Sequence, residues 1–397
     1  MIPRTEYLDN LIRFKDKHLI KVVTGIRRCG KSTLFELYQE YLLQAGVEKT
    51  QIISINLEEG QYFDAEDYRD LYTLVAGRLL PDRMNYIFLD EVQQIKDFQK
   101  AVDALYVRKN CDVYITGSNA YLLSGELATL LSGRYVEIRM LPLSFREYAG
   151  VKGEKRIDQL YQEYLHRSSF PYALELENSK DVQQYLDGIY NSIIVKDIIA
   201  RRRIGDVEML KSVARFLFDN IGNMTSAKKI ADTMTSAGRK ISVHTVENYL
   251  DALTESFIFY QAGRYDIKGK QHLKTGDKYY AADIGLRYHV LGAKKVDLGH
   301  ILENIVYLEL LRRGYEVYVG KVGTAEVDFI AIGEEGEEYY QVAYTVIDAD
   351  GKTLERELAP LNSIADHNPK YLLTMDYSPM ISHNGIRQIY ALDWLLK

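Results

Sequence analysis

The first half of the chain alternates between short apolar runs and longer segments in which apolar residues recur at helical spacing. Residues 31–45 have helical spacing and end before Gly46, a residue typical of the position after a helix. Apolar runs that predict strands lie at residues 19–24, 51–57, 86–89, 112–116 and 136–140. Strands of this kind, covered on both faces and alternating with helices, predict an α/β fold.

The pattern changes after a glycine- and charge-rich stretch at residues 150–155, where we expect a domain boundary. Helical spacing dominates from residue 157 to residue 220. Three helices are predicted at residues 207–220, 226–235 and 242–256, and two strands at 257–261 and 278–282. Three helices followed by a β-hairpin are typical of a winged helix.

An amphipathic helix at residues 301–314 opens the carboxyl-terminal part of the chain. Three strands are predicted after it, at residues 315–319, 326–331 and 339–343. This order of helix, hairpin and strand resembles the core of the PD-(D/E)xK nucleases. In those enzymes a helical Glu, a strand Asp and a Glu or Gln on the next strand bind Mg²⁺, and a Lys two residues later stabilises the attacked phosphate.

Glu303, Asp328 and Gln341 match the first three positions of that nuclease pattern, but Ala343 stands where the Lys belongs. The departure argues against cleavage unless the fold brings Lys321 or Lys352 close. We therefore expect a nuclease-like fold that serves as a binding or assembly module, with hydrolysis of nucleic acid as the alternative.

Composition limits the class of protein without naming it. The chain has 397 residues, a net charge of −6 and two cysteines, Cys29 and Cys111. This charge argues against indiscriminate coating of nucleic acid, and two cysteines suggest neither a disulfide framework nor a zinc site. No uncharged run approaches the length of a membrane span, and residues 1–16 lack the apolar segment of a signal peptide. We expect a cytoplasmic protein.

Residues 25–32, with the sequence GIRRCGKS, match the phosphate-binding loop pattern of two glycines followed by Lys and Ser. Glycines let several backbone N–H groups approach a phosphate, and the helix that follows adds its dipole. Lys31 would reach the β- and γ-phosphates of ATP, and the Ser32 hydroxyl would hold Mg²⁺. The predicted nucleotide-binding residues are Gly25, Arg28, Gly30, Lys31, Ser32 and Thr33.

Two adjacent acids, Asp90 and Glu91, end the apolar run that begins at residue 86. Beside a phosphate loop, Asp90 is predicted to bind the Mg²⁺ shell, and Glu91 to polarise the water that attacks the γ-phosphate. The alternative is a strand end that meets solvent.

Two further residues are candidates for a role in hydrolysis. Asn119, with Ser118 as second choice, follows a predicted strand and could contact the γ-phosphate or the attacking water, unless it serves only a turn. Arg134 could stabilise transition-state charge, in cis or from a neighbouring subunit, or it could be an ordinary loop arginine. A role from a neighbouring subunit would require a homo-oligomer.

Five segments together resemble the AAA-superfamily ATP-binding proteins that pair an AAA_14 domain with a DUF4143 region. They are residues 25–32, 88–93 (FLDEVQ), 116–119 (TGSN), 131–134 (LSGR) and 142–148 (PLSFREY). The resemblance implies a P-loop, AAA-type αβα sandwich with ATP and Mg²⁺ as cofactors, and it supports Asp90 and Glu91 as the metal-binding and water-activating acids.

The predicted domains are an ATPase core at residues 1–150, a helical subdomain at 151–206, a winged-helix module at 207–296 and a nuclease-like domain at 297–397. Residues 196–274 hold 14 basic and 9 acidic side chains, although the whole chain is acidic. Such a local excess suits contact with a phosphate backbone, but winged helices also bind proteins. The candidate DNA contacts are Lys228, Lys229, Arg239, Lys240 and His244.

The sequence as a whole predicts a Mg²⁺-dependent ATPase that drives or gates a winged helix and a nuclease-like domain on or near DNA, with no membrane partner. One alternative is an ATP-controlled signalling or scaffold protein that binds protein partners. A second alternative is an ATP-regulated nuclease.

Overall fold

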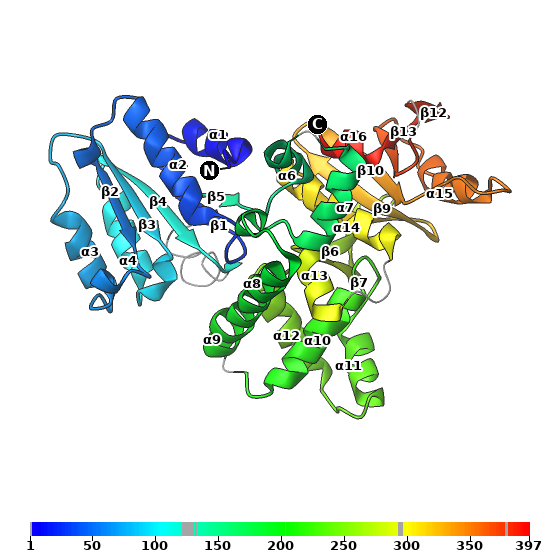
Figure 1. Cartoon of the computed structure of the whole chain (residues 1–397), viewed down its shortest axis with the longest axis horizontal. Coiled ribbons are helices and arrows are strands. Elements are labelled where there is room, and N and C mark those ends of the chain that lie inside the picture. Colours follow the sequence, from blue (N-terminus) through cyan, green and yellow to red (C-terminus); the bar gives the residue numbers. More distant parts are fainter. Residues whose placement is uncertain are drawn as a thin grey trace. The chain divides into compact units, whose positions relative to one another are not determined.

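The computed structural model describes residues 2–120, 131, 133–153, 155–202, 204–292, 297–377 and 380–397 (Figure 1). It separates two compact units. The first unit is Met1–Pro142 with Glu255–Phe257, and the second is Leu143–Thr254 with Ile258–Lys397. Within the described ranges, no helix is both long enough and apolar enough to cross a membrane.

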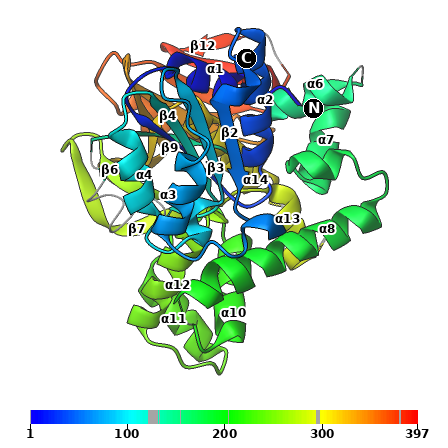
Figure 2. The same ribbon diagram turned by 90° about the vertical axis from the view of Figure 1, so that its left-hand side faces the viewer.

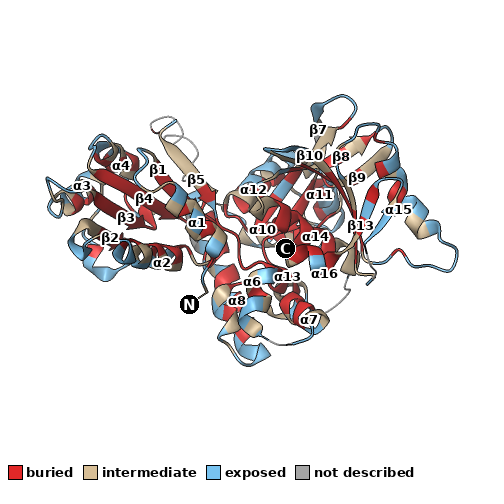
Figure 3. Cartoon of the chain, turned by 90° about the horizontal axis from the view of Figure 1, so that it is seen from above, coloured by how far each residue is buried: buried red, intermediate tan, exposed pale blue. Residues whose placement is uncertain are grey.

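The first unit is built on a parallel five-stranded sheet. The strands are β1 (Ile20–Thr24), β2 (Ile52–Asn56), β3 (Asn85–Asp90), β4 (Cys111–Gly117) and β5 (Tyr135–Arg139), in the order β2-β3-β4-β1-β5. Each neighbouring pair is parallel. The inner strands β1, β3 and β4 are buried along their whole length, as Figure 3 shows in red. This sheet confirms the predicted α/β class of the first unit.

Helices cover both faces of this sheet. They are α1 (Thr5–Arg13), α2 (Lys31–Gln44), α3 (Tyr68–Ala76) and α4 (Phe98–Tyr106). On one face the aromatic rings of Phe35 and Tyr38 from α2 pack against Phe88 of β3. On the other face α3 and α4 lie side by side (Figure 2), and their apolar residues share a core with Ile87 and Ile115. Because strand residues alternate between faces, both layers are needed to bury the strands.

The second unit begins with helices and ends with a mixed α/β layer. Its helices are α6 (Phe145–Lys152), α7 (Ile157–Arg167), α8 (Ser179–Ser192), α9 (Ala200–Arg202), α10 (Val207–Asp219), α11 (Ala227–Ser236), α12 (Val243–Glu255), α13 (Ile284–Leu291), α14 (Leu298–Arg312), α15 (Lys352–Asn362) and α16 (Ala391–Leu395). Its strands are β6 (Phe259–Asp266), β7 (Gln271–Ala281), β8 (Glu316–Val322), β9 (Ala325–Gly333), β10 (Gly336–Ala343), β11 (Lys370–Thr374), β12 (Ile381–His383) and β13 (Ile386–Tyr390).

The eight strands described in the second unit form one sheet, in the order β12-β13-β11-β10-β9-β8-β6-β7. The hairpin β6–β7, which the sequence assigns to the winged helix, therefore continues the sheet of the predicted nuclease-like domain. Residues 264–266 of β6 pair in parallel with residues 319–321 of β8. This pairing covers the backbone groups of β6 that a free hairpin edge would expose. The finer division into four domains stays a prediction.

Candidate functional site

The phosphate loop follows β1, and its backbone requires glycine at two positions. Gly25 has φ 149°, and a Cβ there would lie 2.1 Å from the backbone oxygen of Met140, too close for any side chain. Gly30 has φ 103° and immediately precedes α2. Every residue of β1 is buried, so the packing of this strand fixes the position at which the chain enters the loop. The two glycines of the motif are thus explained by the space and backbone geometry of the loop itself.

Lys31 lies inside the loop. Its side chain is only 4% exposed, and its ammonium donates to the backbone oxygens of Gly25 (3.1 Å) and Ile26 (3.4 Å). The same Nζ atom is 3.8 Å from Oε1 of Glu91. A cation held against loop carbonyls at a helix start can stabilise phosphate charge.

Ser32 and Asp90, the two predicted Mg²⁺ ligands, are brought together. The hydroxyls of Ser32 and Thr116 both donate to the Asp90 carboxylate, which is 6% exposed. Burial raises the pKa of Asp90, and these two hydroxyl donors partly oppose the rise. A hydroxyl beside a carboxylate is the ligand pair with which P-loop proteins hold Mg²⁺, so these residues fit that ion.

Glu91 is held beside this pair in a backbone conformation that is uncommon for a non-glycine residue, with φ 53°. Its N–H donates to Oγ1 of Thr116 at 2.9 Å. Its carboxylate accepts from the side chains of Gln93 and Ser118, the latter at 3.2 Å. These contacts fix the direction of the carboxylate next to Lys31, which suits a group that must orient a water molecule.

Thr116 and Gln93 are site residues that sequence reasoning missed. Thr116 joins the site because β3 and β4 are neighbours in the sheet, so its hydroxyl reaches both acids at the end of β3. Of the two polar candidates after β4, Ser118 contacts Glu91, whereas Asn119 is buried one residue further along. Thr116 could have been suspected from the sequence, because it is a hydroxyl residue near the carboxyl end of the predicted strand that follows the strand ending in Asp90 and Glu91.

The remaining predicted nucleotide-binding residues lie around the loop. Arg28 is exposed and has φ 69°, and Thr33 is half-buried near the start of α2. Of the motif 131–134, Ser132 lies outside the described residues.

Arg134 is not brought to the phosphate loop of its own chain. It directly precedes β5, and its backbone oxygen accepts from the N–H of Ile20, the first residue of β1. The phosphate loop begins at the opposite end of β1, which at about 3.3 Å per residue is roughly 13 Å away. The Arg134 side chain instead pairs with Asp103 and lies over the ring of Tyr106.

Arg4 is a third residue that the sequence did not reveal. It is 2% exposed, and its guanidinium donates to the backbone oxygens of Cys29 in the phosphate loop (2.8 Å) and of Leu141 (2.6 Å). The hydroxyl of Tyr7 accepts a further hydrogen bond, at 3.1 Å, from the backbone N–H of Leu141. Arg4 therefore ties the loop to the segment that follows β5.

Replacing Arg4 with Met is expected to weaken nucleotide binding by about tenfold, because two buried carbonyls lose a charged donor and the loop loses its brace. The measurement is equilibrium binding of a fluorescent ATP analogue to the full chain. Arg13→Met, at an exposed position of α1, is the matched control. Unchanged affinity in Arg4→Met would show that the loop holds its shape without this contact.

The three residues of the nuclease-like pattern also come together, but around a lysine. Glu303 lies on α14, Asp328 on β9 and Gln341 on β10. The ammonium of Lys278, on β7, is 3.0 Å from Oε1 of Glu303 and 3.6 Å from Oδ1 of Asp328. Neither Lys321 nor Lys352 takes this place. Among the described residues, no group of three or more His, Cys, Asp or Glu side chains is arranged to hold a metal ion.

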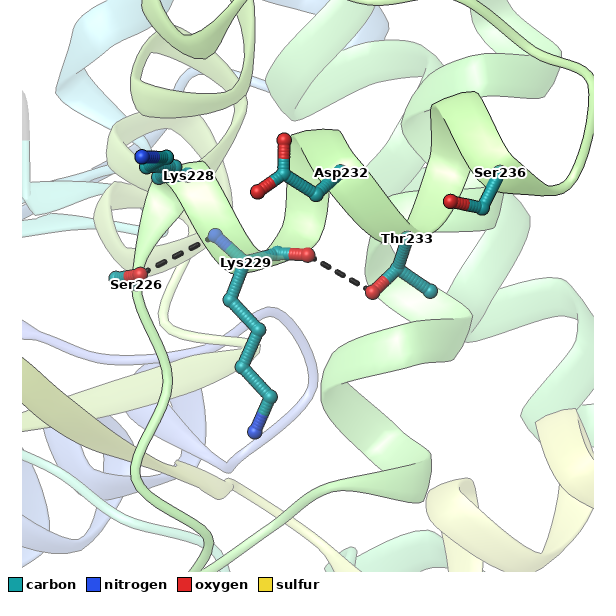
Figure 4. A pocket seen from close by; sticks show the side chains of 6 residues that line it. All are labelled: Ser226, Lys228, Lys229, Asp232, Thr233 and Ser236. Carbon is teal, nitrogen blue, oxygen red and sulfur yellow. Dashed lines mark hydrogen bonds between the residues drawn. The ribbon is translucent and has the colours of Figure 1, made fainter.

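The candidate DNA contacts differ in their exposure and in the contacts that their side chains already make within the chain. Arg239 donates to Ser212 and to the backbone oxygen of Glu208, and His244 lies 3.7 Å from Glu247. Lys228, Lys229 and Lys240 are exposed, and the ammonium of Lys229 also donates to the backbone oxygen of Met224 at 3.2 Å. Figure 4 shows Lys228 and Lys229 at the start of α11, in an open surface pocket, with the Lys229 side chain pointing away from Asp232.

The fold and the loop define an AAA-type P-loop protein, and comparisons with known proteins agree. Residues 17–149 match the family model of the AAA domain AAA_14. Residues 158–297 match a domain of unknown function, DUF8612, whereas the resemblance found in the sequence named DUF4143. A solved structure, the Walker-type ATPase PABY2304 of Pyrococcus abyssi, is similar with a TM-score of 0.52 and 14% identity, over 73% of this chain and 96% of that protein. At this identity the likeness shows the fold alone.

Two curated relatives define the family. An uncharacterised protein of Haemophilus influenzae is 43% identical over 402 residues, which cover 100% of this chain and 99% of that protein. An uncharacterised protein of Methanocaldococcus jannaschii is 30% identical over 345 residues, which cover 82% of this chain and 74% of that protein. The chain belongs to the family of these proteins, and it carries an AAA domain followed by a DUF8612 domain.

Proposed function

We propose that the first unit binds ATP with Mg²⁺ and hydrolyses it. The observation that carries this proposal is the convergence of Lys31, Ser32, Asp90 and Glu91 at the carboxyl end of the parallel sheet, beside a loop whose two motif glycines have positive φ. In this proposal Lys31 binds the β- and γ-phosphates, and Ser32 and Asp90 hold Mg²⁺, which neutralises charge on the phosphates. Glu91 orients and polarises the attacking water.

Nucleotide binding by the full chain tests the first step of this function. Wild type is expected to bind ATP in the presence of Mg²⁺, and Lys31→Ala is expected to bind at least about tenfold more weakly, because the buried ammonium is lost. Lys49→Ala, at an exposed position, serves as the control. Equal affinity in Lys31→Ala and wild type would contradict the proposed role of the loop.

We also propose that the second unit contacts DNA through α11 and the segment that follows it. Support comes from the helix, helix, helix, hairpin order of α10 to β7, from the basic excess of residues 196–274, and from the exposure of Lys228, Lys229 and Lys240. Exposed lysines bind phosphates mainly through counterion release, which makes the affinity depend on salt.

The triple variant Lys228→Ala, Lys229→Ala, Lys240→Ala is expected to weaken duplex DNA binding by about tenfold at low salt. The slope of the logarithm of affinity against the logarithm of salt concentration should also fall by about two to three, because each lost phosphate contact contributes about 0.9. Fluorescence anisotropy over a range of salt concentrations measures both effects. Lys96→Ala, Lys100→Ala, Lys109→Ala, on the first unit, is a control with equal loss of charge. An identical salt slope in the two variants would count against this surface.

A protein partner is the alternative, and the outer face of α12 favours it. This helix is where a winged helix would place base-reading residues, yet Glu247 and Asp251 are exposed there together with Asn248. Two carboxylates repel a phosphate backbone but suit a basic protein surface. Absence of DNA binding at low salt would make this ATP-controlled scaffold the leading function. A role of Arg134 in a neighbouring active site remains part of the proposal and requires a homo-oligomer.

A further inference from the structure

The carboxylate cluster in the second unit is organised around the side chain of Lys278. Its ammonium lies 2.8 Å from Oε1 of Glu326, 3.0 Å from Oε1 of Glu303 and 3.6 Å from Oδ1 of Asp328. These four residues come from β7, α14 and β9, so the lysine joins the hairpin β6–β7 to the helix and the strand beside it. One cation thus contacts three carboxylates from two other elements.

The cluster is largely closed to solvent, which makes its charges expensive to leave unpaired. The side chains of Lys278, Glu303 and Asp328 are 5%, 7% and 13% exposed, and only Glu326, at 36%, reaches the surface. Burial alone would lower the pKa of Lys278, but the carboxylates of Glu303, Asp328 and Glu326 hold it well above its ordinary value. The lysine is therefore a permanent cation at neutral pH.

Further hydrogen bonds hold the predicted metal ligands in place around the ammonium of Lys278. Oε1 of Glu303 accepts from the hydroxyl of Tyr280 at 2.7 Å, and Oδ2 of Asp328 accepts from the N–H of Val342 at 2.9 Å. The amide oxygen of Gln341 accepts from the N–H of Asp328 at 3.3 Å, and its amide nitrogen donates to Glu357 at 2.9 Å. Mg²⁺ requires near-octahedral oxygen ligands, and with the ammonium among them these side chains do not present such a set.

The cluster still carries more negative charge than one lysine neutralises. Glu303, Glu326 and Asp328 bring three carboxyl groups to the single ammonium of Lys278. Removing Lys278 would leave three acidic side chains with no internal cation, and such a group of oxygens attracts a divalent ion.

We propose that Lys278 is the resident cation of this site: its ammonium occupies the place that a divalent metal takes in the nucleases that the domain resembles, and it locks the hairpin β6–β7 to α14 and β9. The wild-type cluster accordingly neither binds a divalent metal nor cleaves nucleic acid. Loss of the lysine converts the cluster into a metal-binding site.

Binding of Mn²⁺ to the nucleotide-free full chain, measured by electron paramagnetic resonance, tests this proposal. Lys278→Met is expected to bind one Mn²⁺ more than wild type does, with an affinity at least about tenfold above any wild-type binding. Adding Glu303→Gln to Lys278→Met is expected to abolish that gain. Lys268→Met, at an exposed position between β6 and β7, is the matched control and should behave as wild type.

Two results would overturn the proposal. One is Mn²⁺ binding by wild type that Glu303→Gln or Asp328→Asn removes, because the cluster would then be an open metal site. The other is a folded Lys278→Met protein, judged by circular dichroism, that gains no Mn²⁺. Should Lys278→Met not fold, the comparison of wild type with Asp328→Asn decides: binding that depends on Asp328 contradicts the resident cation, and absence of such binding supports it.

Discussion

Glu91→Gln is expected to lower steady-state ATP turnover by at least about 100-fold, whereas ATP binding changes by less than about threefold. The amide preserves the shape of the side chain and its contacts with Gln93 and Ser118, but it cannot polarise water as a carboxylate does. Ser32 and Asp90 are unchanged, and Lys31 keeps its hydrogen bonds to the loop carbonyls of Gly25 and Ile26, so the nucleotide remains bound. Phosphate release and equilibrium nucleotide binding are measured on the same preparation.

Glu59→Gln is the matched control for this experiment. Glu59 is an exposed acid shortly after β2, and its replacement should leave turnover at the wild-type level. Normal turnover by Glu91→Gln would remove Glu91 from the mechanism. A loss of ATP binding as large as the loss of turnover would assign it a role in shaping the site instead.

The second large effect concerns a buried ion pair in the core of the first unit. Lys21 of β1 and Asp112 of β4 form this pair with side chains that are 0% and 2% exposed. Asp112 also accepts from the hydroxyl of Tyr114 (2.7 Å), and Lys21 donates to the backbone oxygen of Lys17 (2.7 Å). Burial lowers the pKa of Lys21 and raises that of Asp112, and in each case the partner's charge opposes the shift.

Lys21→Met is expected to destabilise this sheet by about 3–5 kcal/mol, because it leaves the Asp112 carboxylate buried without its partner. The double change Lys21→Met, Asp112→Leu should recover most of that loss, since two apolar side chains avoid the desolvation of both charges. Hydrogen exchange of the β1 and β4 amides in the full chain measures the opening free energy locally, without assuming that the chain unfolds in one step.

Lys100→Met provides a surface comparison for the buried pair. Lys100 pairs with Asp97 at 3.0 Å with side chains 48% and 33% exposed, so its loss should cost less than about 1 kcal/mol. A similarly small effect of Lys21→Met would mean that water or a rearranged side chain compensates Asp112.

The phosphate loop and the acidic strand end were predictable because their geometry is local. Glycines that precede Lys31, and a buried strand that ends in Asp90 and Glu91, specify their own backbone environment. The apolar runs likewise predicted β1, β3 and β4, since complete burial leaves little choice of residue type.

The residues that escaped prediction depend on contacts between distant segments. Thr116 joins the site only because β4 lies beside β3, and Arg4 reaches the loop from 25 residues away in sequence. The sequence places Arg134 just before a predicted strand. Only the parallel pairing of β5 with β1 shows that it lies at the amino ends of these strands, away from the phosphate loop.

The same limit applies to the carboxyl-terminal cluster. Glu303, Asp328 and Gln341 were found from the resemblance to the nuclease core, but Lys278 precedes the predicted domain and enters the cluster because β6 pairs with β8. A pattern that looks for lysine two residues after Gln341 finds Ala343 and has no means of locating a cation on another strand.

Steady-state ATP hydrolysis by the purified full chain, compared with Lys31→Ala prepared in the same way, tests the central claim most directly. The account predicts phosphate release that requires Mg²⁺ and that falls to background in Lys31→Ala. Phosphate release at the same rate in both proteins, or none above background from wild type under conditions in which it binds ATP and Mg²⁺, would contradict it.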